Sequence, residues 1–176
     1  MAIGAVFVVV SALIWAPDRL WSGCGLGWTL LLLAIIDLED GVLPDRLTLP
    51  LLVAGLVWGE LADGGDLARH IAGAALGGGL LAVPAMGYRR LRRRDGMGWG
   101  DVKLAAAVGA WLGWEAMPAM IVVAALTTIA AVLLRRRICA TSLDAAIPFG
   151  PALAAATWLL WLSGPRNSIF LDSLMP

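Results

Sequence analysis

Long blocks of apolar residues recur along the whole chain and constrain its fold more than any other feature. Seven of them approach the roughly 20 residues that an α-helix needs to cross a bilayer. They cover about residues 1–16, 20–38, 47–62, 67–88, 102–115, 117–134 and 147–163. Only 15% of the residues are charged, against about 25% in a typical soluble domain. The sequence therefore predicts an all-α integral membrane protein, a polytopic bundle of about seven transmembrane helices forming a single domain over residues 1–176.

The arginines predict how the bundle is oriented. Five of them lie between residues 89 and 94, and a second cluster occupies residues 135–137, two predicted spans later. Loops rich in Lys and Arg stay in the cytoplasm, so both clusters and the loop at 39–46 are expected on that side. The loop at 63–66 and the C-terminus are then expected outside. Tryptophans near the predicted span ends are expected at the membrane interfaces: Trp15, Trp21, Trp58, Trp111, Trp114, Trp158 and Trp161.

Charge and cysteine content exclude several classes of function. The formal net charge is zero, so no bulk field favours nucleic acid as a partner. Cys24 and Cys139 are far apart and form no CxxC pair, which argues against a disulfide framework or a zinc knuckle. The glycine-rich run at 73–79 predicts close packing between helices, because small residues let membrane helices approach each other.

Two aspartates stand apart from the other acidic residues. Asp37 ends the second apolar block and Asp101 begins the fifth, whereas the other acids lie in predicted loops. Acidic residues at membrane depth are costly and usually functional. Under the predicted topology both lie at cytoplasmic helix ends, where they can meet across the bundle. The only histidine, His70, lies near the predicted outer face and is expected to be an interfacial residue rather than a ligand.

A facing pair of aspartates predicts a specific chemistry. Two carboxylates held close together cannot both ionise easily, so one pKa rises and the pair shares a proton. The ionised member activates a water molecule and the protonated member polarises a peptide carbonyl, with no covalent intermediate. This mechanism needs no metal and no organic cofactor. Because the proton belongs to the coupled pair, the sequence does not assign the two roles.

The segment before Asp101 adds candidate substrate contacts. Gly98 and Gly100 flank Trp99, and residues without a Cβ let the chain turn sharply or let a substrate backbone come close. A flexible joint after the basic loop is the alternative interpretation. Lys103 lies two residues beyond Asp101 and can contact the substrate or tune the pair. Its alternative is a lysine that reaches from the helix to the membrane interface.

Three segments resemble one protein family. The stretch GMGWGDVKLAAAVGAWLGW at 96–114 is similar to the signature of the type IV prepilin peptidases, which are GxGD-type membrane aspartic proteases. The stretch IDLEDGVLPDRLTLPLL at 36–52 resembles their first catalytic motif, in which an aspartate is followed seven residues later by proline, here Asp37 and Pro44. The stretch IPFGPALAAATWL at 147–159 resembles the C-terminal segment of the bacterial enzymes.

The resemblance implies a multi-pass endopeptidase of the bacterial inner (cytoplasmic) membrane. Such an enzyme removes the leader peptide of type IV prepilins or type II secretion pseudopilins on the cytoplasmic side, so its partners are the N-terminal segment of a prepilin and the lipid bilayer. The matching positions imply Asp37 and Asp101 as the catalytic pair. Many bacterial members carry an N-terminal domain with CxxC motifs that is associated with N-methylation, and none is seen in this sequence. A short, peptidase-only form is therefore expected.

Two other interpretations remain open at this point. The run DLEDG resembles the opening of the CDP-alcohol phosphatidyltransferase motif, in which Asp37 and Asp40, one helical turn apart, would share a divalent metal ion. The remainder of that motif is missing, because Pro44 and Asp45 replace its Ala-Arg and no GxxxDxxxD follows at its spacing. The other interpretation is a membrane component of pilus assembly that has lost catalysis, which the presence of both aspartates disfavours.

Overall fold

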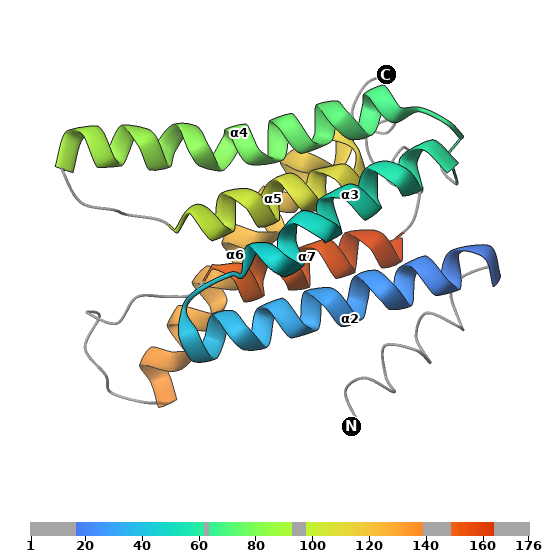
Figure 1. Cartoon of the computed structure of the whole chain (residues 1–176). Coiled ribbons are helices and arrows are strands. Elements are labelled where there is room, and N and C mark those ends of the chain that lie inside the picture. Colours follow the sequence, from blue (N-terminus) through green and yellow to red (C-terminus); the bar gives the residue numbers. More distant parts are fainter. Residues whose placement is uncertain (1–16, 62–63, 93–97, 139–148, 164–176) are drawn as a thin grey trace, which may run out of the picture.

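The computed structural model describes residues 17–61, 64–92, 98–138 and 149–163, and these residues are almost entirely helical. Six α-helices follow one another and are joined by short connections. They are α2 (Pro17–Asp40), α3 (Asp45–Leu61), α4 (Leu67–Arg92), α5 (Trp99–Leu112), α6 (Met117–Ile138) and α7 (Gly150–Ser163), with the 3₁₀ turn η1 (Trp114–Ala116) before α6. Successive helices run in opposite directions through one bundle (Figure 1). The prediction of an all-α protein is thus confirmed for the described part of the chain.

The helices coincide in position with the six apolar blocks predicted from residue 20 onward. Three stretches are long and apolar enough to cross a membrane, namely Trp21–Asp40, Leu67–Leu91 and Trp114–Leu134. α3, α5 and α7 contain 17, 14 and 14 residues and are shorter than a typical full span. The predicted count of about seven spans is therefore not confirmed, and the first predicted block lies outside the described residues.

Glycines let α4 and α5 pack backbone against backbone. A Cβ on Gly73 would collide with the carbonyl oxygen of Gly109, and a Cβ on Gly109 would collide with that of Gly73. Gly77 approaches the carbonyl oxygen of Ala105 in the same way. The expectation that the run at 73–79 packs closely is confirmed for Gly73 and Gly77, whereas Gly79 faces open space. Close contact of this kind maximises van der Waals attraction between membrane helices.

Three tryptophans expected at the membrane interfaces instead contact one another inside the bundle. The rings of Trp58 and Trp111 stack with centroids 6.2 Å apart, and Trp161 meets both rings edge-on. Trp111 also donates its Nε1–H to the carbonyl oxygen of Leu51 at 2.8 Å. Trp111 and Trp161 are buried. The prediction of their depth in the membrane stays untested, but the rings turn into the bundle, which position along a helix does not reveal.

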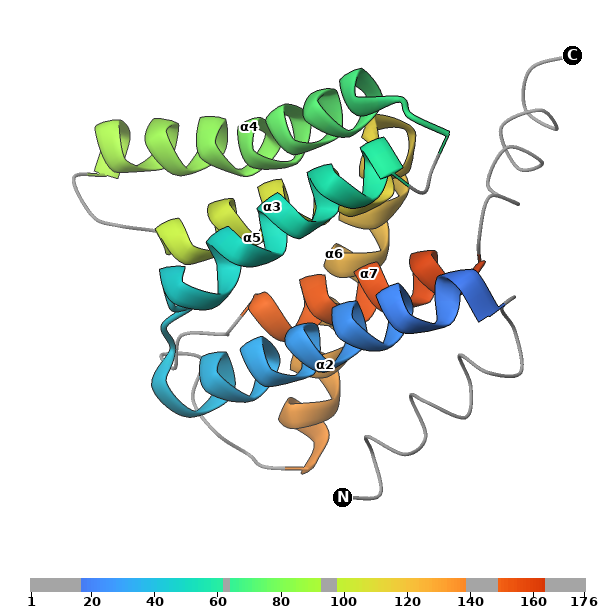
Figure 2. The ribbon, with the colours of Figure 1, turned by 45° about the vertical axis from the view of Figure 1, so that its right-hand side comes forward.

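One end of the bundle gathers the segments that the sequence marked as functional. The C-terminal end of α2 and the N-terminal ends of α3, α5 and α7 all lie at this end (Figures 1 and 2). The C-terminal ends of α4 and α6, which carry the arginine clusters, lie there too. The described ends of the basic segments and the two aspartates therefore share one side of the bundle, as the topology prediction requires.

Candidate active site

Asp37 continues the buried stripe of α2. Leu26, Leu30 and Leu33 lie on one face of this helix at a spacing of three to four residues, and each is at most 2% exposed. Asp37 is the next position on that face and is 6% exposed. Helix periodicity thus directs its carboxylate into the bundle, which is an expensive place for an unpaired charge.

The carboxylate of Asp37 is held by the start of α7. Its Oδ2 accepts the backbone N–H of Gly150 at 3.1 Å. A Cβ on Gly150 would lie 2.6 Å from the same oxygen, so only glycine allows this approach. The segment at 147–159 resembles a family pattern, but its sequence alone indicated no role for Gly150. The available signal was a glycine directly before proline at the start of an apolar block.

Asp101 lies in the first turn of α5, outside the three stretches long enough to cross a membrane. Its backbone N–H donates to the carbonyl oxygen of Gly98 at 3.2 Å. Burial, and after it the negative charge of Asp37, raises the pKa of the Asp101 carboxyl from 3.8 to about 6. The two carboxylates, 64 positions apart in the sequence, therefore lie close enough to influence each other's ionisation. Shared protonation of such a pair is the arrangement that activates water in aspartic proteases.

The loop between α2 and α3 packs against the start of α5. Gly41 closes α2, because its N–H donates to the carbonyl oxygen of Asp37 at 3.1 Å and its φ of 65° is in the left-handed region. Leu43 is buried, and a Cβ on Gly100 would lie 2.8 Å from the Cβ of Leu43. The absence of a side chain at Gly100 thus lets the loop that follows Asp37 reach the turn that carries Asp101.

This geometry does not test the predicted contacts of Gly98 and Gly100 with substrate. It does bear on the expectation that the two glycines allow a sharp turn. Gly98 caps α5 with φ −67° and ψ 138°, an ordinary extended conformation. Among the described glycines neither Gly98 nor Gly100 has a positive φ. A sharp turn therefore does not require glycine at either position. Among the described residues, the nearest atoms to a Cβ on Gly98 would be 3.9 Å away, so no described side chain fills the space beside Gly98.

Lys103 forms an ion pair at the edge of the site. Its Nζ lies 2.6 and 2.7 Å from the two carboxylate oxygens of Asp45, the first residue of α3. The side chains are 40% and 54% exposed. Neither interpretation of Lys103 from the sequence, contact with the substrate or the pair and extension to the membrane interface, included this partner, which is 58 residues away. Its only signal was a lone lysine at the start of an otherwise apolar helix.

The described residues offer little support for a metal site. Asp40, the second ligand in the phosphatidyltransferase interpretation, is exposed at the end of α2, while Asp37 is buried. Within the described ranges no group of three or more His, Cys, Asp or Glu side chains is arranged to hold a metal ion. Within the described residues, the negative charge of Asp37 contributes to the raised pKa of Asp101, which links these two carboxylates rather than Asp37 and Asp40.

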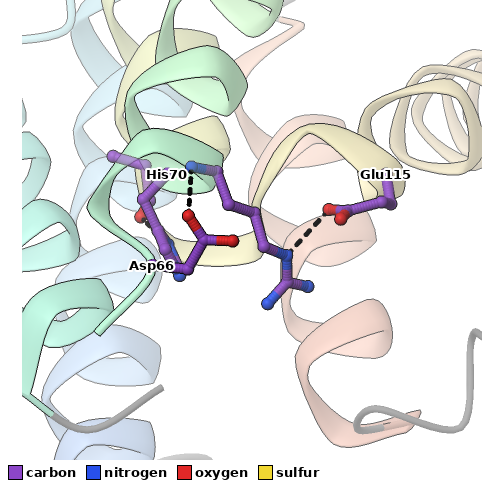
Figure 3. A network of polar contacts seen from close by, with 5 residues as sticks. Asp66, His70 and Glu115 are labelled. Carbon is purple, nitrogen blue, oxygen red and sulfur yellow. Dashed lines mark hydrogen bonds and ion pairs between the residues drawn. The ribbon is translucent and has the colours of Figure 1, made fainter. Parts of the chain in front are cut away.

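His70 belongs to the opposite end of the bundle. It is fully buried, and its Nδ1–H donates to the carbonyl oxygen of Ala110 at 2.8 Å. Beside it, Nε of Arg69 lies 2.8 Å from Glu115, and the Arg69 N–H donates to Asp66 at the start of α4 (Figure 3). The expectation of an interfacial histidine was therefore wrong. These contacts join α4 to η1 and α5 far from the aspartates.

The comparisons with known proteins agree with this geometry. Residues 24–133 match the sequence profile of the type IV leader peptidase family. The chain is 42% identical to the leader peptidase HopD of Escherichia coli over 133 residues, which cover 73% of this chain and 84% of HopD. It is 42% identical over 142 residues to the prepilin leader peptidase/N-methyltransferase of Aeromonas hydrophila, covering 77% of this chain and 48% of that protein.

A protein of the same name from Burkholderia pseudomallei is 39% identical over 158 residues, which cover 88% of this chain and 50% of the relative. The chain thus spans about half the length of these two larger relatives. No solved structure matches it. The match over residues 24–133 includes both aspartates, Gly98 and Gly100, and it extends over more than half of the sequence. This chain belongs to the type IV leader peptidase family.

Proposed function

We propose that this protein is an aspartic endopeptidase whose catalytic pair is Asp37 and Asp101. The observation that carries the proposal is that two acidic residues from different helices, the buried Asp37 and the half-buried Asp101, lie at the same end of the bundle, near enough for the charge of Asp37 to raise the pKa of Asp101. In such a pair one carboxyl keeps a proton while the other is ionised. The ionised group removes a proton from water as the protonated group hydrogen-bonds to the scissile carbonyl. The resulting tetrahedral intermediate then collapses with cleavage of the C–N bond.

The proposed substrate is the leader peptide of type IV prepilins or type II secretion pseudopilins. Support comes from the relatives, which are named leader peptidases and prepilin leader peptidases. We propose that Gly98 and Gly100 let an extended substrate backbone approach Asp101, and that Lys103 contacts it. Gly98 has open space beside it, and Lys103 is 40% exposed, which leaves an ammonium proton for a further acceptor.

We propose that the protein is a multi-pass protein of the bacterial inner membrane, with the aspartates on the cytoplasmic side. The shared position of the aspartates and the arginine-bearing helix ends supports this orientation through the positive-inside rule. The exposed apolar side chains of the long helices fit a lipid environment. Examples are Leu126, Ile129 and Leu133 on α6, each more than half exposed.

Cleavage of a prepilin by the protein in membranes tests this function. Wild type should remove the leader, and Asp37→Asn and Asp101→Asn should each reduce the rate by at least ~100-fold, since loss of a positioned acid or base typically costs 10²–10⁴. Asp40→Asn is the matched control, because Asp40 lies on the same helix and is exposed. It should cleave like wild type.

Loss of cleavage in Asp40→Asn together with dependence on a divalent cation would favour the metal-enzyme alternative. If either Asp37→Asn or Asp101→Asn still cleaves the prepilin while it inserts normally into the membrane, the proposed mechanism is wrong. A panel of prepilins should include one that a related peptidase cleaves in parallel. If the wild-type protein cleaves none of them, the result supports the alternative of a pilus-assembly membrane component that has lost catalysis.

A further inference from the structure

The N-terminus of α7 presents a single donor to Asp37. The carbonyl oxygen of Phe149 accepts the N–H groups of both Ala152 and Leu153, so Phe149 caps the helix and Gly150 is its first helical residue. The next residue, Pro151, has no N–H. In the first turn of α7, the N–H of Gly150 is therefore available to an acceptor outside the helix. It donates to Oδ2 of Asp37.

The two carboxylates differ in their hydrogen bonds. An N–H group can only donate, so its bond to Asp37 is strongest when Asp37 is ionised. Within the described part of the chain, a backbone hydrogen bond acts on the carboxylate of Asp37, whereas burial and the charge of Asp37 act on that of Asp101, which lies in the first turn of α5. Lys103, the nearest cation on α5, is paired with Asp45 instead.

We infer that Gly150 is a positioning residue that makes the pair asymmetric: Asp37 carries the negative charge and acts as the base, and Asp101 carries the proton. This inference rests on the proposed peptidase function and deepens it, because it assigns the two roles that sequence alone leaves open. Gly150 acts through Asp37, by fixing Oδ2 and leaving Oδ1 to receive the proton from water.

The assignment gives a balanced reaction. The water oxygen forms a bond to the carbonyl carbon while one of its protons moves to Oδ1 of Asp37. The carbonyl π electrons move to its oxygen, which takes the proton of Asp101. When the intermediate collapses, that proton returns to Asp101, the C–N bond breaks, and the leaving nitrogen takes the proton held by Asp37. Water is consumed, and both aspartates regain their starting states.

Gly150→Ala tests the positioning role. The new Cβ would lie 2.6 Å from Oδ2 and 3.0 Å from Cγ of Asp37, and Asp37 supplies the closest atoms, so the displacement falls mainly on that side chain. Gly25→Ala is the control, because it adds the same methyl group to a helix at a position with no atom of the described residues within 4 Å. We expect kcat for prepilin cleavage to fall ~10–100-fold in Gly150→Ala with KM unchanged, as misplaced catalytic groups do. Gly25→Ala should match wild type. Unchanged kcat, or a rise in KM alone, in Gly150→Ala would overturn the positioning role.

Infrared spectroscopy tests the assignment of the proton without substrate. Near pH 6, wild type should show a protonated-carboxyl band that disappears in Asp101→Asn and remains in Asp37→Asn, because burial is the larger cause of the raised pKa of Asp101. A band that persists at wild-type intensity in Asp101→Asn, or that is absent from wild type, would overturn the assignment. Because this measurement needs only folded protein, it separates failure of the inference from failure of the proposed peptidase function, which is judged by wild-type cleavage.

Discussion

Nζ of Lys103 lies 2.6 and 2.7 Å from the two carboxylate oxygens of Asp45, which joins the first turn of α5 to the first residue of α3. Each of these residues follows one member of the aspartate pair in the sequence, by two positions after Asp101 and by eight after Asp37. The ion pair therefore ties together the two segments that lead away from the catalytic pair. Its partial exposure limits its contribution to stability to about 0.2–1 kcal/mol.

Swapping the charges of Lys103 and Asp45 distinguishes two roles of Lys103, as the ion-pair partner of Asp45 and as a contact for substrate. Asp45→Lys and Lys103→Asp should each lower the melting temperature slightly, because each places like charges side by side. The double exchange should restore the melting temperature. If Lys103 also contacts the prepilin, the double variant should keep a raised KM, measured by cleavage kinetics in detergent. Complete recovery of KM would mean that Lys103 serves only as the partner of Asp45.

The glycines before Asp101 should respond differently to the same substitution. Gly100→Ala places a Cβ 2.8 Å from the Cβ of Leu43, so the α2–α3 loop must move. We expect a lower melting temperature and a lower kcat. In Gly98→Ala the nearest atoms are 3.9 Å away, so the fold should tolerate the change. If substrate approaches here, KM should rise several-fold at constant melting temperature. A Gly98→Ala enzyme with wild-type KM would remove Gly98 from the substrate site.

The positions of the helices were predictable because long apolar blocks separated by polar loops are visible in one dimension. The direction in which each side chain points, into the bundle or out of it, was not predictable. Trp58, Trp111 and Trp161 lie near helix ends, as expected, but their faces turn into the bundle. His70 is buried for the same reason, since its neighbours come from other helices.

The acidic residues of the candidate site were predictable from the sequence, but the hydrogen bonds and ion pairs around them were not. Asp37 and Asp101 are identifiable because acids at apolar helix ends are rare and costly. The bond from Gly150 to Asp37 is made by a backbone N–H 113 residues away, and backbone groups carry no residue-type signal. The Lys103–Asp45 pair likewise depends on how α3 packs against α5, which hydropathy does not encode.

The raised pKa of Asp101 predicts how stability depends on pH. The carboxyl titrates near 3.8 when unfolded and at about 6 when folded, so the folded state binds more protons between these values. The contribution of Asp101 to stability is fully present below pH 3.8 and is lost as the pH rises through about 6. Asp101→Asn should therefore be more stable than wild type above about pH 6, with the gain shrinking toward about pH 4.

Thermal unfolding in detergent micelles across this pH range measures that difference. Groups that do not interact with Asp101 contribute equally in both proteins and cancel in the comparison, whereas Asp37 interacts with Asp101 and belongs to the measured difference. Asp40→Asn controls for the loss of one carboxylate at an exposed position of α2. A difference between Asp101→Asn and wild type that is constant over the range would contradict the raised pKa.

Substitution of two glycines of α4 by alanine should change the stability of the protein in opposite directions. Gly73→Ala would drive a Cβ into the carbonyl oxygen of Gly109, and backbone atoms of α5 cannot yield without separating the helices. Its melting temperature should fall by several degrees, because loss of close packing removes the main attraction between these membrane helices. Gly79→Ala, on the same helix with open space around it, should be neutral or stabilising by up to about 1 kcal/mol through its better helix propensity. Equal melting temperatures for the two variants would show that α4 and α5 do not meet at Gly73 and Gly109.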